Sequence, residues 1–196
     1  MCRWGGGMES MSLSEPMSVP EIAVNWYALK VFYNKVFEIE KILQTEGVET
    51  YIPTEQVTIE VKGMKKHVRK VILPSLMFFR STEEFAIGLQ QKLMGRVMVY
   101  TNLEKRPNRR PAPISDEEMH NFRLVVSAGD EGLEFFADDY MQYKDGQKVR
   151  VTGGVFEGAE GVIKRIKHNR RLTVTLKGVC MVATSFIDPK WLETVE

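Results

Sequence analysis

The spacing of apolar residues changes several times along the chain. Residues 24–31 are apolar at even and odd positions alike, as in a strand covered on both faces. Val36, Ile39 and Leu43 then recur at helical spacing, and Gly47 should end that helix. Similar patterns predict extended segments at 48–53, 57–62, 71–79 and 97–100, and helices after the capping boxes Ser81/Glu84 and Ser115/Glu118. This order predicts an α+β domain over 23–129, with three helices flanking a mostly antiparallel sheet.

The last fifty residues have a different pattern. Val149 and Val151 alternate with basic residues, and glycines follow at 153, 154, 158 and 161 before another apolar pair. Glycine suits positive φ and close approach of strands, so this stretch predicts two short strands joined by a tight loop. Short extended segments continue to Val195, and five strands in so few residues predict a small all-β barrel over 145–196.

Composition adds the remaining organisation. We expect 1–22, rich in Gly, Ser, Met and Pro, to be a disordered leader, and 130–144 to be an acidic linker between the domains. The cysteines, Cys2 and Cys180, form no CxxC pair, so we expect no metal and no cofactor. No apolar run approaches membrane-span length, which favours a cytoplasmic protein, and we expect a monomer without a membrane partner.

The formal net charge of +1 conceals three basic clusters. They comprise Lys62, Lys65, Lys66, Arg69 and Lys70; Lys105, Arg106, Arg109 and Arg110; and Lys164, Arg165, Lys167, Arg170 and Arg171. Acidic residues gather at 116–118 and 130–139. Such segregation suits a protein that contacts nucleic acid with some surfaces and protein with others, although each cluster alone could be a solvated loop.

Several short motifs occur in order along both domains. They are Trp26-Tyr27, Ile52-Pro53-Thr54-Glu55, Arg96-Val97-Met98, the run from Arg110 to Ser115, and the Gly-rich stretch from Asp145 to Ile163. Together they resemble the NusG family of transcription elongation factors, whose first domain is the NGN domain and whose second is the SH3-like KOW barrel. The resemblance extends from Asn25 to Val195.

Departures from the general family pattern point to a subtype. Pro74-Ser75-Leu76 replaces the usual Pro-Gly-Tyr, and Gly154-Val155-Phe156 replaces Gly-Pro-Phe. These differences resemble the specialised paralogues that prevent termination on surface-polysaccharide operons. The resemblance therefore implies an operon-specific antitermination factor, with the housekeeping elongation factor as the alternative.

The resemblance also implies where such a factor binds. An apolar surface of the first domain would contact the clamp helices of the largest RNA polymerase subunit. Non-template DNA or nascent RNA would contact a basic corner, and RNA, a ribosomal protein or Rho would contact the second domain. The candidate polymerase-binding residues are Leu73, Leu76, Phe78, Phe79, Met98 and Tyr100; the candidate DNA-binding residues are Lys30, Tyr33, Asn34, Lys35 and Arg96; the candidate RNA or ribosomal-partner residues are Lys164, Arg165, Lys167, Arg170 and Arg171.

Two other classes of function compete with this reading. A KOW-type RNA-binding or ribosome-associated module would use only the second domain and the basic loops. An enzyme is disfavoured, because His67, His120 and His168 stand in separate polar segments and no nucleophile or phosphate-loop motif occurs.

Overall fold

The computed structural model describes residues 23–101, 109–137, 146–167 and 169–195. The expected leader, the end of the expected linker, and Lys105 and Arg106 of the second basic cluster lie outside these residues. Within the described part of the chain, no helix is long and apolar enough to cross a membrane.

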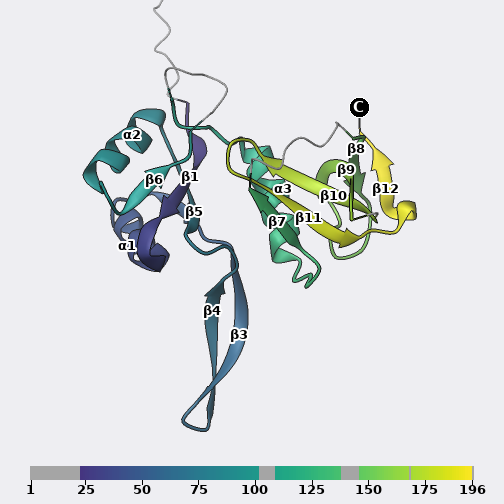
Figure 1. The fold of residues 1–196 in the computed structure, drawn as a ribbon, viewed down its shortest axis with the longest axis horizontal. Helices are drawn as coiled ribbons and strands as arrows, with labels where there is room; N and C mark the ends of the chain where they lie inside the picture. Colours follow the sequence, from purple (N-terminus) through teal and green to yellow (C-terminus); the bar gives the residue numbers. More distant parts are fainter. Residues whose placement is uncertain (1–22, 102–108, 138–145, 168, 196) are drawn as a thin grey trace, which may run out of the picture.

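The first sheet has four antiparallel strands in the order β2-β5-β1-β6 (Figure 1). Its members are β1 (Asn25–Val31), β2 (Glu49–Tyr51), β5 (Leu76–Ser81) and β6 (Val97–Val99). Ala28 pairs with Phe78 and Leu29 with Met77. Because side chains alternate along each strand, these two rows face opposite sides of the sheet. The antiparallel sheet predicted for the first domain is confirmed.

Three helices cover the two faces of this sheet. Helices α1 (Val36–Thr45) and α2 (Glu83–Lys92) bury one face, where Leu29, Met77 and Phe79 join the core. Helix α3 (Asp116–Ser127) covers the other face, and the ring of Phe122 lies 5.4 Å from that of Phe78. Burial of these aromatic rings supplies much of the apolar area that fixes the helix on the sheet.

The helix starts agree only partly with the sequence signals. The capping box of Ser115 and Glu118 forms at α3 as predicted. At α2 the cap is Thr82, whose hydroxyl accepts the Phe85 N–H, rather than Ser81. Asn34 does not cap α1; its φ is 55°, and α1 follows Lys35 without a side-chain cap.

A separate hairpin leaves the first domain between β2 and β5. Strands β3 (Thr54–Val61) and β4 (Met64–Val71) pair with each other along their whole length and form a two-stranded sheet of their own. Figure 1 shows this hairpin extending away from both larger sheets.

The second sheet has the order β12-β8-β9-β10-β11-β7. Its strands are β7 (Glu134–Ala137), β8 (Lys148–Val151), β9 (Glu160–Ile166), β10 (Asn169–Leu176), β11 (Cys180–Phe186) and β12 (Leu192–Thr194), the last preceded by the 3₁₀ turn η3 (Pro189–Trp191). The predicted all-β character of this domain is confirmed, but in the described residues the sheet has two unpaired edges and does not close into a barrel. Strand β7, from the expected linker, occupies the edge of β11 that a closing strand would need.

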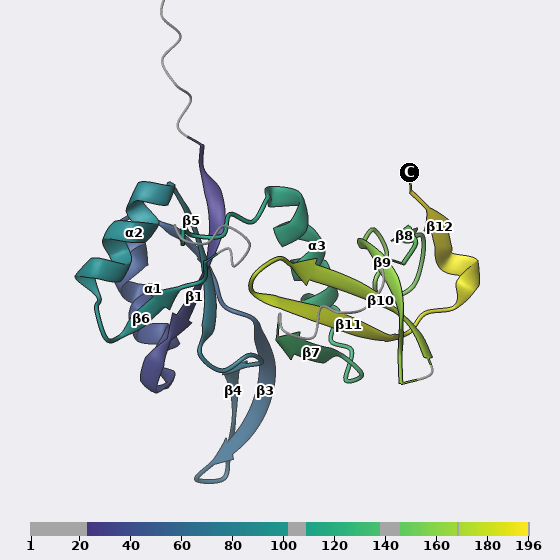
Figure 2. The same ribbon diagram turned by 45° about the horizontal axis from the view of Figure 1, so that its top comes forward.

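Helix α3 lies between the two sheets (Figure 2). One continuous apolar core includes Phe78 and Phe122 of the first domain together with Val151 and Leu172 of the second. The two domains therefore share a buried core instead of being joined by the linker alone.

Candidate functional site

The five candidate DNA-binding residues meet at one corner of the first domain. Lys30 lies near the end of β1, just before the 3₁₀ turn η1 (Phe32–Asn34). In that turn the backbone N–H of Phe32 donates to the carbonyl of Arg96 at 2.9 Å. This bond holds the loop before β6 beside the turn. A pocket of about 230 Å³ is lined by Val31, Phe32, Tyr33, Lys35, Ile39 and Arg96. The structure thus brings together residues that are distant in sequence.

The backbone of this corner is strained. Tyr33 (φ 61°) and Asn34 (φ 55°) are consecutive left-handed residues, which is uncommon outside glycine. The Tyr33 side chain is 80% exposed, so no burial of its ring accounts for the conformation. Strained residues of this kind cost about 1–3 kcal/mol each and concentrate at functional sites. The turn presents an aromatic ring to solvent.

A carboxylate partly offsets the positive charge here. Glu38 of α1 pairs with Lys35 at 3.2 Å and also with Arg96. The hydrogen bond from Lys35 lowers the pKa of Glu38 below its ordinary value, with Arg96 acting in the same direction. The pairs orient the two cations around the pocket while leaving them at the surface, where an incoming phosphate could compete for them.

The candidate polymerase-binding residues divide between the two faces of the first sheet. Leu76 and Met98 both oppose Lys30 in register and share its face, and Tyr100 donates its backbone N–H to Ala28 in the next row of that face. Phe79 points the other way, into the core with Tyr27, whose ring is 5.8 Å away. The structure therefore removes Phe79 from the candidate surface.

Burial narrows the surface further. Phe78 is fully buried beneath α3 and Leu76 is nearly so, whereas Leu73 and Tyr100 are half-buried and Met98 is 42% exposed. Of the six residues, only Leu73, Met98 and Tyr100 offer side-chain surface to a partner in this conformation. Alternation predicted such a division, but the sequence did not show which residues α3 would cover.

The second domain lies against this same face. A Cβ placed on Gly178, in the turn between β10 and β11, would be 3.5 Å from the carbonyl oxygen of Thr101 and 3.6 Å from the Cβ of Ala112. Burial raises the pKa of the nearby Tyr100 hydroxyl. The sequence gave no signal for this contact, because it joins residues from two separately folded sheets.

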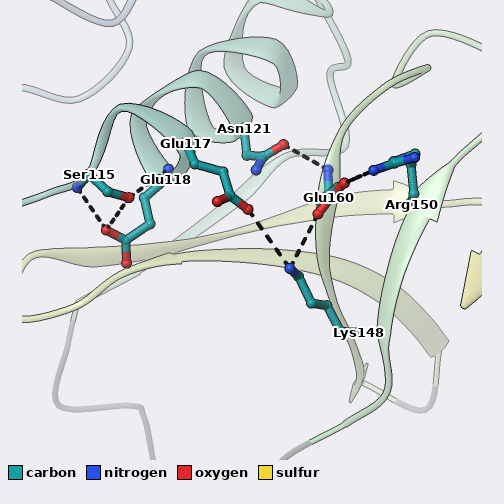
Figure 3. A network of polar contacts seen from close by, with 7 residues as sticks. All are labelled: Ser115, Glu117, Glu118, Asn121, Lys148, Arg150 and Glu160. Atoms are coloured by element: carbon teal, nitrogen blue, oxygen red, sulfur yellow. Dashed lines mark hydrogen bonds and ion pairs between the residues drawn. The ribbon is translucent and has the colours of Figure 1, made fainter. Parts of the chain in front are cut away.

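Helix α3 makes the polar contacts between the domains (Figure 3). The backbone N–H of Glu160 donates to the Asn121 side chain at 2.8 Å, and Lys148 lies between Glu117 at 3.8 Å and Glu160 at 3.3 Å. Arg150 also pairs with Glu160, and these two cations lower the pKa of Glu160. The predicted linker is therefore not the only connection that positions the second domain.

The third basic cluster falls on the β9–β10 hairpin. Arg170 opposes Arg165, and Arg171 opposes Lys164. Glu134 of β7 pairs with Lys167 at 2.7 Å and with Arg171 at 2.8 Å, and the hydrogen bond from Lys167 lowers the pKa of Glu134. The five residues share one hairpin, but the acidic segment already neutralises two of them.

An aromatic residue that we did not predict lies beside this cluster. Phe186, at the end of β11, is 65% exposed and lines a pocket of about 550 Å³ together with Arg165 and Arg170. Ile187 and Leu192 contribute apolar walls. An exposed ring next to arginines is the combination that stacks and holds single-stranded nucleic acid. Its only sequence signal was a phenylalanine in the last apolar strand.

Comparison with known proteins places this architecture in a family. The family model described as "Transcription termination factor nusG" matches residues 24–123, about half of the chain. The protein named "Transcription termination/antitermination protein NusG" from Borreliella burgdorferi is 27% identical over 161 residues, which cover 74% of this chain and 84% of that protein. A solved structure titled "Domain interaction in Thermotoga maritima NusG" is 19% identical and aligns over 89% of this chain and 98% of that one, with a TM-score of 0.42. The matched span contains the whole first sheet and the basic corner, and the chain belongs to the NusG family of transcription termination and antitermination factors.

Proposed function

We propose that this chain is an antitermination factor that binds RNA polymerase through its first domain and suppresses pausing or termination on specific operons, including those for surface polysaccharides. The observation that carries the proposal is the exposed Tyr33 ring on a strained turn beside Lys30, Lys35 and Arg96. In a family of transcription factors, a presented aromatic ring among cations fits an exposed DNA strand: the ring stacks on a base and the cations hold phosphates.

The polymerase-binding surface would be the row around Met98. Met98, Tyr100 and Leu73 lie on the sheet face that also carries Lys30, so one partner could span the apolar row and the basic corner. Binding of that face to a closed polymerase clamp would disfavour paused conformations by differential affinity. Aromatic anchors would contribute most, with truncation of a true anchor costing at least ~2 kcal/mol.

Full use of this face would require the second domain to move. The turn at Gly178 lies against Thr101 and Ala112, next to Tyr100. The proposal therefore includes separation of the domains on polymerase binding, at the expense of the contacts that α3 makes with β9. Free chain and polymerase-bound chain would differ in the relative position of the two sheets.

In vitro transcription tests the proposal directly. Matched polymerase would be assayed with and without the protein, on templates with and without the leader of the target operon. Tyr33→Ala should lose read-through, since base stacking contributes roughly 1–3 kcal/mol per base. The control is Ile87→Ala, which removes an exposed apolar side chain from α2. Absence of any effect on pausing or termination, on any template, would refute the proposal.

The housekeeping elongation factor is the alternative within the same family. Deletion of the gene separates the two roles. Loss of the distal transcripts of one operon supports the specialised factor, whereas a general growth defect with changes across the transcriptome supports the housekeeping role.

A second candidate function is an RNA-binding or ribosome-associated module. The observation that favours it is the pocket of Phe186, Arg165 and Arg170 on the second domain. This role predicts salt-sensitive binding of RNA in the absence of polymerase. Co-purification with polymerase that survives nuclease treatment would count against RNA binding as the main activity.

A further inference from the structure

The β3–β4 hairpin has a shape that none of the functions above uses. Eight residues of each strand pair without interruption, and the two-residue tip of Lys62 and Gly63 has φ values of 53° and 77°. Two left-handed residues in sequence are the mark of a type I′ turn, which matches the twist of the strands and makes a tight tip. At about 3.3 Å per residue, the ribbon reaches roughly 25 Å from the sheet it leaves. It is a long, narrow arm (Figure 1).

The outer half of this arm is strongly basic. Lys62, Lys65 and Lys66 lie there, and Arg69 and Lys70 follow nearer the base of the arm. Lys70 pairs with Glu55 at 2.9 Å, and Arg69 contacts Glu40 of α1 at 3.4 Å. Within the described part of the chain, no ion pair holds Lys62, Lys65 or Lys66, and all three are exposed. The far end of the arm thus carries a net positive charge, since Glu60, opposite Lys65, is the one acidic residue beside these three lysines.

The two faces of the ribbon differ in chemistry. One face carries hydrogen-bonding side chains in cross-strand pairs: Gln56 with Arg69, Thr58 with His67, and Glu60 with Lys65. The other carries the apolar residues Val57, Val68, Ile59, Val61 and Met64, of which the last three are exposed, together with Lys66 opposite Ile59 and Lys70 opposite Glu55. No Phe, Tyr or Trp occurs between Thr54 and Val71, and the imidazole of His67 hydrogen-bonds with the Thr58 hydroxyl at 3.1 Å. The ribbon can therefore donate many hydrogen bonds and bind phosphate, but it lacks the large aromatic rings that usually stack on bases.

We propose that this ribbon binds double-stranded DNA by lying in the major groove. The groove of B-DNA, about 12 Å wide, admits a two-stranded ribbon, and lysines along the ribbon would reach the phosphates on both sides. Single strands are bound mainly through aromatic stacking, for which this ribbon has no Phe, Tyr or Trp, and the major groove of RNA duplexes is too narrow for side chains. A protein partner fits less well, because lysine is depleted and aromatic residues are enriched at such interfaces.

The inference does not rest on polymerase binding or on the corner at Tyr33. The corner would take an unpaired strand, whereas the ribbon would take a duplex. A protein that fails every transcription assay could still bind duplex DNA through this arm, and the reverse holds as well.

The test is fluorescence anisotropy of a labelled mixed-sequence DNA duplex, with its single strand and an RNA duplex as separate probes. The double variant Lys65→Gln/Lys66→Gln should weaken duplex binding roughly tenfold. The slope of log affinity against log salt concentration should become shallower, by the amount expected for about two lost phosphate contacts. The matched control, Lys41→Gln with Lys177→Gln, removes two exposed lysines elsewhere and should change little. Circular dichroism and a thermal melt check that both variants are folded.

A variant with the opposite expected effect guards against misfolding. Glu60→Gln removes the carboxylate opposite Lys65 and should strengthen duplex binding about threefold, which a damaged hairpin would not do. Equal duplex affinity for the wild type and Lys65→Gln/Lys66→Gln overturns the proposal. So does an equal loss in the control pair, or a larger loss for the single strand or the RNA duplex than for the DNA duplex.

Discussion

The Asn121 side chain accepts a hydrogen bond of 2.8 Å from the backbone N–H of Glu160, and so joins α3 of the first domain to β9 of the second (Figure 3). Asn121 is only 7% exposed, and its bond lies beside the apolar core that both domains share. A buried N–H without an acceptor costs free energy, so this side chain specifies where β9 sits on the helix.

Asn121→Ala should therefore weaken the domain contact. The unpaired Glu160 N–H is expected to cost about 1–3 kcal/mol, slightly reduced because alanine favours helix more than asparagine does. Denaturant unfolding measures the loss. His120→Ala, at an exposed position of the same helix, is the control. If both variants unfold at the same denaturant concentration, the hydrogen bond does not hold the domains together.

Two glycines of the Gly-rich loop make a matched pair. Gly154 and Gly158 have φ values of 83° and 85°, so alanine is strained at both. A Cβ on Gly154 would also lie 2.7 Å from the Trp191 ring, whereas the nearest atom to a Cβ on Gly158 is 3.9 Å away. Gly154→Ala should cost about 1–3 kcal/mol more than Gly158→Ala, the usual range for overpacking.

Tryptophan fluorescence during denaturant unfolding compares the two glycine variants, since Trp191 reports on the second domain. Equal destabilisation would mean that the Trp191 ring moves aside without loss, and that only the backbone conformation requires glycine at Gly154.

The first domain was largely predictable from sequence because its signals are local. Periodicity placed the strands and helices, and the Ser115–Glu118 box fixed the start of α3. Long-range relationships were not predictable in the same way. Nothing in the acidic residues around Glu134 indicates that β7 would pair with β11, and that pairing leaves the second sheet open instead of closed.

In the candidate site, too, some residues could be predicted from the sequence, whereas the long-range contacts around them could not. Lys30, Tyr33, Lys35 and Arg96 were predicted from the family resemblance, whereas the Phe32–Arg96 hydrogen bond that holds the loop beside the turn had no signal in the sequence. For Phe78 and Phe79, hydrophobicity alone could not separate surface from core. Phe78 is covered by α3 from a distant part of the chain, and Phe79 by α1 and α2.

The pKa of Asp116 should be visible in the resonance of Trp26. Asp116 accepts two hydrogen bonds from Arg80, at 2.9 and 3.1 Å, and one from the Trp26 indole N–H at 2.9 Å. Arg80 is the main cause that lowers the pKa of Asp116 below its ordinary 3.8, and Trp26 adds to it. In NMR spectra recorded during an acid titration, the Trp26 indole N–H should shift with a midpoint below pH 3.8.

The same pKa gives a direction for stability. Because the folded pKa is the lower one, the contribution of Asp116 is complete above pH 3.8 and is lost as the pH falls through the folded value. Asp116→Asn should lose less stability than the wild type over that acid range. An identical pH dependence in the two proteins would mean that the Arg80 contact does not persist in solution.

Glu134→Gln should strengthen RNA binding by the second domain, if the β9–β10 cluster binds RNA as proposed. The substitution releases Lys167 and Arg171 from their carboxylate, and the exposed Lys167 becomes available to phosphates. For single-stranded RNA, each additional phosphate contact should steepen the slope of log affinity against log salt concentration by about 0.7. Glu131→Gln, an exposed acid of the same segment, changes the net charge equally and is the control.

Binding titrations of both variants at several salt concentrations separate a specific effect from an effect of net charge. A specific role for Glu134 requires that its variant gain affinity and salt dependence while the control stays near the wild type. Equal gains would reflect net charge alone, and no gain would place RNA binding elsewhere on the chain.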